Sequence, residues 1–404
     1  MTGAFLHPFA KPARPSFIRL ASGRGATVTT EDGRELIDGM ASLWYCAIGH
    51  GRPEMAEAVS RQMTTLEAYS AFDPFTTAPA DEVSARIAAL SPIRDARVFL
   101  CGSGSEAVDS AMKLARVAHV QAGHPERTVI ISRTRGYHGT NYGGTSAQGI
   151  APNKVGYGTL LDDVMQVDAD DIEAMSVAME KNKGRLAAVI AEPVQGAGGV
   201  FPATVEYLQG LRKLCDRHGA YLIYDEVITG FGRLGEWFGA THYGVIPDMI
   251  TFAKAVTSGY QPLGGVICAP SVTQPLESDP DFILRHGYTY SGHASVCAAA
   301  LKNIEIIENE NLLARSVQIG KRLGEGLTAL ANDGTIAAAR GRGAVWAAAL
   351  KPDQDAIKIR DRMLELGAIT RAINDCNTFC PPFVITDAQI DTLLDVFATA
   401  ASGR

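Results

Sequence analysis

The chain has 404 residues, which is enough for one large domain and a smaller one. Its 46% hydrophobic and 20% charged content is that of a soluble globular protein, and its net charge of −7 offers no basic surface to nucleic acid or an anionic membrane. No apolar stretch reaches the roughly 18 residues that a membrane span requires, and residues 1–9 lack the basic and apolar regions of a signal peptide.

The seven cysteines are scattered along the chain, and most of them lie inside apolar runs. This distribution is typical of reduced thiols in the core of a cytoplasmic protein. Cys376 and Cys380 could be taken as metal ligands, but no second pair and no nearby histidine accompanies them. We therefore expect a cytoplasmic protein and no metal site.

Short apolar runs typical of buried strands alternate with helical patterns through the middle of the chain. The expected strands are 97–101, 128–132, 186–191, 220–224, 249–252 and 265–269, and the expected helices include 105–121 and 204–218. This order predicts an α/β fold whose mostly parallel sheet is covered on both faces. Residues 1–65 and 305–404 mix long polar helices with short strands, so we expect them to form one small domain beside a large domain of residues 66–304.

Three motifs follow separate strands of the expected sheet. They are Gly102-Ser-Gly104-Ser105-Glu-Ala107 at the start of a helix, Asp225-Glu226-Val227, and Lys254. In parallel sheets ligands bind beyond the carboxyl ends of the strands. A lysine, a carboxylate and a helix N-terminus are the contacts that pyridoxal phosphate needs, because the lysine forms an imine, the carboxylate holds the ring nitrogen protonated and the helix start binds the phosphate.

Each motif has another interpretation when it is taken alone. The glycine-rich segment loosely matches a dinucleotide fingerprint, but the next strand ends in Ser132-Arg133 without an acidic residue for a ribose. Asp225-Glu226 could bind the metal of an ATPase, but the chain has no Gly-x4-Gly-Lys-[Ser/Thr] segment. A helix cap, a core carboxylate and an exposed loop lysine remain the plain structural alternatives. The ordered set of three favours pyridoxal phosphate.

Two further motifs end strands at the same expected edge. Tyr137-His138-Gly139 follows the strand 128–132, and an aromatic ring there can stack on the cofactor, although a core tyrosine would fit as well. Glu192 ends the strand 186–191, so its carboxylate is expected to point toward the same site, with a surface ion pair as the alternative.

Over essentially its whole length the chain resembles the class III pyridoxal-phosphate aminotransferases of the fold type I superfamily. The matching segments are Asp38-Gly-Met40, Leu43-Trp44, Gly102–Ala107, Tyr137-His-Gly139, Glu192-Pro-Val-Gln-Gly196, Asp225–Arg233, Phe252-Ala-Lys254, Tyr288–His293 and Arg371. The resemblance implies a large domain with a mostly parallel seven-stranded sheet and a small α/β domain built from both termini.

The resemblance also implies a role for each matching residue. Lys254 would be the Schiff-base lysine and Asp225 the partner of the ring nitrogen, with Tyr137 and Val227 on the two ring faces. The remaining cofactor-binding residues would be Gly104, Ser105, His138, Glu192 and Thr289, the last reaching across from a second subunit. One subunit alone would then lack a phosphate contact, which requires a homodimer with shared sites or a dimer of such dimers.

Within this family the chain is most similar to the omega-amino acid:pyruvate branch, as His7-Pro8-Phe9, Leu43-Trp44 and Thr257–Gly264 indicate. The 4-aminobutyrate and ornithine branches usually carry glutamine three positions after the aspartate, where it bonds the cofactor 3′-oxygen. Ile228 stands there, which counts against those branches and leaves the 3′-oxygen contact unassigned.

The expected reaction is a ping-pong transfer of an amino group from an omega-amino acid or primary amine to pyruvate. In the substrate site, Arg371 would swing in to bind carboxylates and out for apolar groups, Trp44 would wall the apolar part, and Glu192 would pair with nearby cations when no acceptor is bound. The alternatives are another class III transaminase (diaminopelargonate, 4-aminobutyrate or ornithine type), a racemase or aminomutase on the same fold, and a non-catalytic binding protein.

Overall fold

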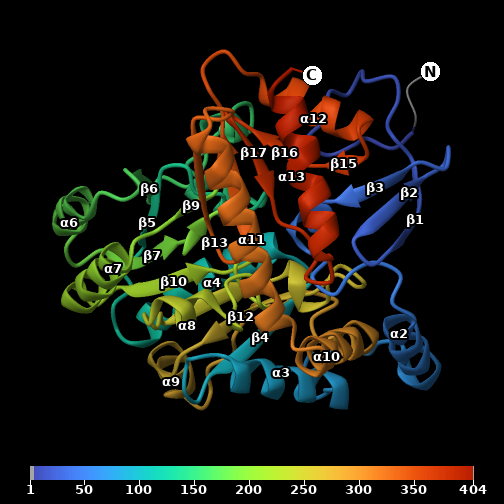
Figure 1. Ribbon diagram of the computed structural model, residues 1–404. Helices are drawn as coiled ribbons and strands as arrows, with labels where there is room; N and C mark the ends of the chain where they lie inside the picture. The colour runs from blue at the N-terminus through green and yellow to red at the C-terminus, as the bar shows by residue number, and fades with distance from the viewer. Residues whose placement is uncertain (1–3, 404) are drawn as a thin grey trace.

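A seven-stranded sheet forms the centre of the protein in the computed structural model, which describes residues 4–403 (Figure 1). Residues 1–3, the start of the segment searched for a signal peptide, lie outside the described part, as does residue 404. In spatial order the strands are β4 (Arg97–Cys101), β12 (Gly264–Cys268), β11 (Met249–Phe252), β10 (Tyr221–Asp225), β7 (Leu186–Ala191), β5 (Val129–Arg133) and β6 (Val164–Val167).

Five neighbouring strands of this sheet, from β11 to β6, are parallel, while β12 is antiparallel to both β11 and β4. The mostly parallel seven-stranded sheet is thus confirmed. Every residue of β7 and β10 is buried, because helices cover both faces, and this explains their continuous apolar sequences. The expected strands agree with the structure to within one residue at each end. The edge strand β6, whose residues are only half-buried, lacks such an apolar run and was not predicted.

Helices pack on the two faces of the sheet in separate apolar clusters. The cluster on one face contains residues of α4 with Ile130, Ile190 and Ile223, and the other contains residues of α7 with Ile131 and Leu222. The helices of this region are α3 (Ala78–Leu90), α4 (Gly104–Gln121), α5 (Tyr142–Ala147), α6 (Ile172–Lys181), α7 (Val205–His218), α8 (Gly239–Tyr243), α9 (Pro270–Glu277) and α10 (Ala294–Asn309), with 3-10 turns η1 (Ala151–Lys154) and η2 (Lys254–Val256).

Segments from both ends of the chain lie together beside this region (Figure 1). Strand β15 (Ala368–Ile369) pairs in parallel with β3 (Glu35–Asp38), so that it completes a sheet with β1 (Leu20–Arg24) and β2 (Thr27–Thr30). A second sheet has the order β13 (Ala338–Arg342), β14 (Val345–Ala349), β17 (Cys376–Phe379) and β16 (Arg371–Ile373). The remaining elements are α1 (Ala41–Trp44), α2 (Pro53–Leu66), β8 (Val194–Gln195), β9 (Phe201–Pro202), α11 (Leu312–Asn332), α12 (Ala356–Glu365) and α13 (Asp387–Ala401).

The expected domain boundaries at residues 65 and 305 stay a prediction. The first lies at the end of α2 and the second inside α10, and these two helices pack against each other.

Candidate active site

The carboxyl ends of the central strands bring the three predicted motifs to one edge of the sheet. β10 ends at Asp225, which pairs with Thr251 of β11, three residues before Lys254. β4 runs in the same direction as β11, because both are antiparallel to the strand β12 between them, so α4 begins at the same edge. A Cβ atom added to Gly104 of α4 would lie 2.9 Å from Val227 Cγ1 and 3.5 Å from the Cβ of Ala253, the residue before Lys254. The helix start therefore lies next to the other two motifs.

Asp225 is held in one orientation by three donors. Its Oδ2 lies 2.8 Å from His138 Nδ1, and its Oδ1 accepts hydrogen bonds from the Val227 amide (3.2 Å) and from Thr251 Oγ1 (3.3 Å). Asp225 is 5% exposed and His138 1% exposed. A buried carboxylate needs a positive partner, and the protonated nitrogen of a pyridine ring is such a partner. The contact between His138 and the Asp225 carboxylate could not be predicted from the motif Tyr137-His138-Gly139.

Lys254 projects from a strained turn. Its φ of +51° lies in the left-handed region, which residues with a side chain seldom adopt, and it opens the 3-10 turn η2. Burial lowers the pKa of Lys254 from 10.5 to about 8, although the negative charges of Asp225 and Glu192 act in the opposite direction. The neutral, nucleophilic fraction of the amine at neutral pH is therefore about two orders of magnitude larger than for an exposed lysine.

The N-terminus of α4 has the properties of a phosphate site. Within the described residues, the amides of Gly104 and Ser105 donate to no protein acceptor, as is usual for the first turn of a helix. Ser103, which the sequence did not single out, is the N-cap and accepts a hydrogen bond from the Glu106 amide. Ser105 Oγ lies beside the loop after Tyr137, where it accepts a bond from the Thr140 amide at 3.0 Å. Free amides and a positive helix end suit a phosphate dianion.

Glu192 and Tyr137 are joined through the main chain. The Tyr137 amide donates to Glu192 Oε1 (2.9 Å) and the Gly196 amide to Oε2 (3.0 Å), while the guanidinium of Arg133 donates to the Glu192 carbonyl. Burial raises the pKa of Glu192. Its carboxylate makes no ion pair with Arg371, so the expected pairing with a nearby cation is not formed by these two side chains. The Tyr137 ring is half-buried, and burial raises the pKa of its hydroxyl.

Arg371, in β16, has an unusual environment for an arginine. Its side chain is half-buried, yet it has neither an ion-pair nor a hydrogen-bond partner in the part of the chain that the structure describes. Burial lowers the pKa of Arg371, and the positive charge of Arg371 in turn lowers those of Tyr137 and Lys254. A guanidinium remains charged under such shifts. The structure thus places an uncompensated cation close to the lysine.

Trp44 and Thr289 occupy opposite kinds of environment. Trp44 is 2% exposed in a segment of left-handed residues, and Asp38 holds this segment by accepting bonds from the amides of Met40 (2.9 Å) and Ser42 (2.7 Å). Thr289 is exposed, next to Tyr288, whose hydroxyl donates to the Glu106 carbonyl in the first turn of α4 at 3.3 Å. Thr289 is thus available to a second molecule.

Together these groups fit pyridoxal phosphate. Free amides at a helix start suit its phosphate, the carboxylate of Asp225 suits its ring nitrogen, and a lysine of lowered pKa suits its aldehyde. Gly139, with φ of +95°, lies against Ser105, and a side chain there would come within 2.7 Å of Ser105 Oγ, so glycine permits this close approach of the two loops.

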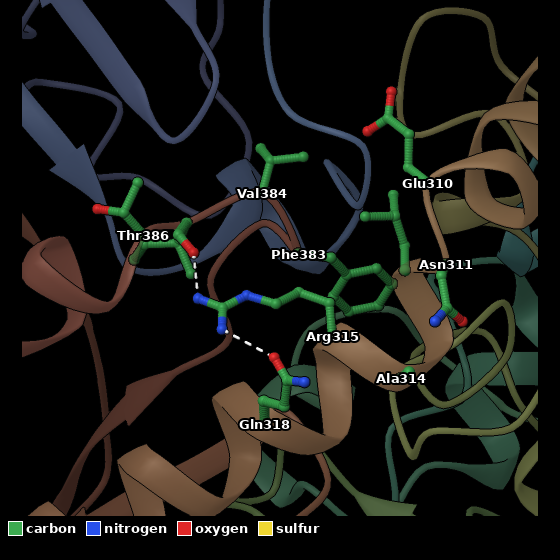
Figure 2. Close-up of a pocket in the computed structure, with 10 residues that line it drawn as sticks. Glu310, Asn311, Ala314, Arg315, Gln318, Phe383, Val384 and Thr386 are labelled. Atoms are coloured by element: carbon green, nitrogen blue, oxygen red, sulfur yellow. Dashed lines mark hydrogen bonds between the residues drawn. The ribbon is translucent and has the colours of Figure 1, made fainter.

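A surface cavity of about 510 Å³ lies elsewhere, at the start of α11 (Figure 2). Its main polar group is Arg315, whose guanidinium already bonds the Ile385 carbonyl (2.7 Å), Asp387 (2.7 Å) and Gln318 (3.2 Å). None of the predicted site residues lines it. We assign it no catalytic role.

Residues 4–403 contain no group of three or more histidine, cysteine, aspartate or glutamate side chains placed to hold a metal ion. No helix in that range is both long and apolar enough to cross a membrane. All seven cysteines are buried and unbridged, as expected for core thiols.

Comparison with known proteins gives a consistent result. The model of the family described as Aminotransferase class-III matches residues 9–401. The chain is 34% identical to a beta-alanine–pyruvate aminotransferase of Pseudomonas aeruginosa (95% of this chain, 92% of the relative). It is 33% identical to a diaminobutyrate–2-oxoglutarate transaminase of Halomonas elongata (96% and 91%). A crystal structure of a PLP-bound amine transaminase from an uncultivated Pseudomonas species is 32% identical, with a TM-score of 0.94 and 99% of each chain covered. The chain therefore belongs to the class III aminotransferases, has the fold of the fold type I enzymes and depends on pyridoxal phosphate.

Proposed function

We propose that this aminotransferase moves an amino group from an omega-amino acid or a primary amine to pyruvate by a ping-pong mechanism. The observation that carries the proposal is the partner-free guanidinium of Arg371 beside Lys254 and Tyr137. In a ping-pong reaction the donor and the acceptor occupy the same site in turn. One free cation serves an acceptor with one carboxylate, because a planar guanidinium binds a single carboxylate through two charge-assisted bonds.

The same argument disfavours a dicarboxylate acceptor. 2-Oxoglutarate would bring a second carboxylate, and burying it without a second cation would be costly. Among the causes of the Lys254 pKa shift, Arg371 is the cation that contributes. In an omega-amino acid the carboxylate is distant from the amino group, and a primary amine has no carboxylate. The amino group that reacts therefore stays away from the Arg371 guanidinium.

Four side chains take part directly in the proposed reaction, and His138 orients one of them. When bound, pyridoxal phosphate supplies an electron sink for negative charge that develops on the amine-bearing carbon of the substrate. Lys254 carries the cofactor between turnovers and, once freed by the donor, moves the proton at that carbon with its neutral amine. Asp225, oriented by His138, keeps the ring nitrogen positively charged. Tyr137 and Val227 flank the ring.

One buried residue, Ile228, supports the choice of branch. Ile228 packs against the main chain so closely that a side chain on Gly196 would come within 2.4 Å of Ile228 Cδ1. An apolar residue there cannot donate a bond to the cofactor 3′-oxygen. The names of relatives include both a pyruvate enzyme and a 2-oxoglutarate enzyme at similar identity, so a class III 2-oxoglutarate transaminase is the second candidate.

A substrate matrix tests the proposal. The purified enzyme is offered β-alanine, putrescine, 4-aminobutyrate, ornithine and 1-phenylethylamine, each with pyruvate and with 2-oxoglutarate, and alanine and glutamate are measured. We expect alanine formation to exceed glutamate formation by at least tenfold with the best donor. Glutamate as the main product with every donor would contradict the acceptor proposal and favour the second candidate.

We further propose a cytoplasmic homodimer in which each subunit lends Thr289 to the other's phosphate site. Large apolar side chains are exposed at the start of α5 and in three loops: Tyr142 in α5, and Tyr69, Phe72, Phe75, Val155, Tyr157, Ile283, Leu284 and Tyr290 in the loops. So many exposed apolar residues are unusual for a monomer and typical of a subunit interface. The free, buried thiols agree with a reducing compartment.

A further inference from the structure

The turn that carries Lys254 has an unfavourable backbone conformation. Both Lys254 and Ser258 have a φ of +51°, and the 3-10 turn η2, which begins at Lys254, is only three residues long. Left-handed residues with side chains are retained only where their surroundings fix them. Some group outside the turn must therefore hold it.

Asn303, on α10, is that group. It is 0% exposed, and its Nδ2 donates to the carbonyls of Ala255 (2.9 Å) and Val256 (3.0 Å), which follow Lys254 directly. Its Oδ1 accepts a hydrogen bond from Ser258 Oγ (2.6 Å), at the other end of the turn. Both amide protons of Asn303 are thus used on the lysine turn.

The network extends to the wall of the site. Ser258 Oγ also accepts a hydrogen bond from the amide of Ile48 at 3.2 Å, at the end of the strained segment that contains Trp44. Asn303 consequently links three parts of the chain: the segment 41–48, the lysine turn and α10. All the hydrogen bonds of the Asn303 side chain go to the lysine turn, which indicates a role in that turn beyond general core packing.

We propose that Asn303 is a positioning residue, which sets the location of Lys254 Nζ by clamping the two carbonyls after it. This inference rests on the proposed role of Lys254 as the cofactor-bearing lysine. No other side chain of similar size can replace the amide. Aspartate would direct an oxygen at the two carbonyls, leucine offers no donor, and glutamine is one carbon longer. Loss of the clamp lets the turn relax from its left-handed conformation and displaces the amine.

The test uses Asn303→Asp and Asn303→Leu in the full-length protein, with Ile307→Ala as the matched control. Ile307 is equally buried, one helical turn further along α10, so its truncation loosens the same helix without removing the clamp. Three quantities are measured: the rate of pyridoxal phosphate uptake by the apoprotein, the pH midpoint of the visible band of the loaded protein, and kcat and KM.

For both Asn303 variants we expect uptake and kcat to fall by about tenfold to a hundredfold, the range expected for a misplaced reacting group, while KM for the amine changes less than threefold. The pH midpoint should move in both, whereas Ile307→Ala should lower the unfolding temperature and leave midpoint and uptake unchanged. If Asn303→Leu does not fold, Ser258→Ala takes its place, because it removes one hydrogen bond of the clamp. It should lower uptake and kcat and move the pH midpoint in the same directions by smaller amounts.

Unchanged midpoints and uptake in the Asn303 variants, or equal shifts in Ile307→Ala, would overturn the inference. Borohydride reduction of the wild-type protein, followed by peptide mapping, separates this outcome from a failure of the underlying proposal. If the cofactor is fixed to Lys254 but the Asn303 variants keep the wild-type uptake rate and pH midpoint, only the positioning role is rejected. Label on another lysine rejects the site itself.

Discussion

Replacing Arg371 with methionine should separate acceptor binding from the rest of catalysis. Methionine keeps much of the apolar stem of the side chain and removes only the charged end. In the free protein the guanidinium is already half-buried without a partner, so its desolvation does not have to be repeated when a carboxylate binds. A charge-assisted pair of this kind contributes about 1.5–3 kcal/mol. Its loss should raise KM for pyruvate by roughly 10- to 150-fold.

The same variant should not lose stability. Because burial of the unpaired charge disfavours the folded protein, its removal should leave the free energy of unfolding unchanged or raise it by about 1 kcal/mol. The assay is therefore double: steady-state kinetics with pyruvate, and chemical unfolding of the same preparation. The single-turnover rate with a carboxylate-free amine such as 1-phenylethylamine should change less than threefold.

Arg340→Met is the matched control, because Arg340 lies in the same small sheet but its guanidinium bonds the Gly199 carbonyl at 2.8 Å. This variant should keep KM for pyruvate. Equal losses in both half-reactions of Arg371→Met, or an equal rise of KM in Arg340→Met, would refute the assignment of Arg371 to the acceptor carboxylate.

Three other predictions follow from the site. Asp225→Asn keeps shape but not charge, so kcat should fall at least a hundredfold, about 3 kcal/mol of transition-state stabilisation, and near-normal turnover would make Asp225 structural. Uptake of pyridoxal phosphate by the apoprotein should accelerate as pH rises through about 8, because the neutral amine of Lys254 exists above its lowered pKa and is lost below it; an inflection near 10.5 would argue against burial of that amine. Mixing inactive Lys254→Ala subunits with Thr289→Ala subunits should regain up to about a quarter of the wild-type sites, since only mixed dimers contain one complete site; activity no greater than the separate variants would contradict shared sites.

Most of the fold and the outline of the site could be predicted from local sequence. The strand ends at Asp225 and before Lys254 were found because apolar runs end there in polar residues, and parallel strands end at a common edge. The N-terminus of α4 was found because glycine and serine precede a run of good helix formers.

The contacts that orient these groups could not be predicted, because they join residues far apart in the chain. His138 meets Asp225 across 87 positions, and Asn303 meets the lysine turn across 48. The Tyr137 and Gly196 amides donate to the two carboxylate oxygens of Glu192, and its expected pairing with nearby cations stays a prediction. Every residue except proline carries the same main-chain N–H, so the sequence cannot indicate which of these donors will bind a given carboxylate. Their directions depend on the folded backbone.

Borohydride reduction of the loaded enzyme, followed by peptide mapping, tests the central claim most directly. We predict that the cofactor is fixed to Lys254 alone and that Lys254→Ala binds cofactor without covalent label. Lys154 is the internal control, because burial lowers its pKa as well while its Nζ bonds Gln166 and the Ser146 carbonyl away from the predicted site residues. Label on Lys154 or on any lysine other than Lys254, or no label at all, would contradict the site described here.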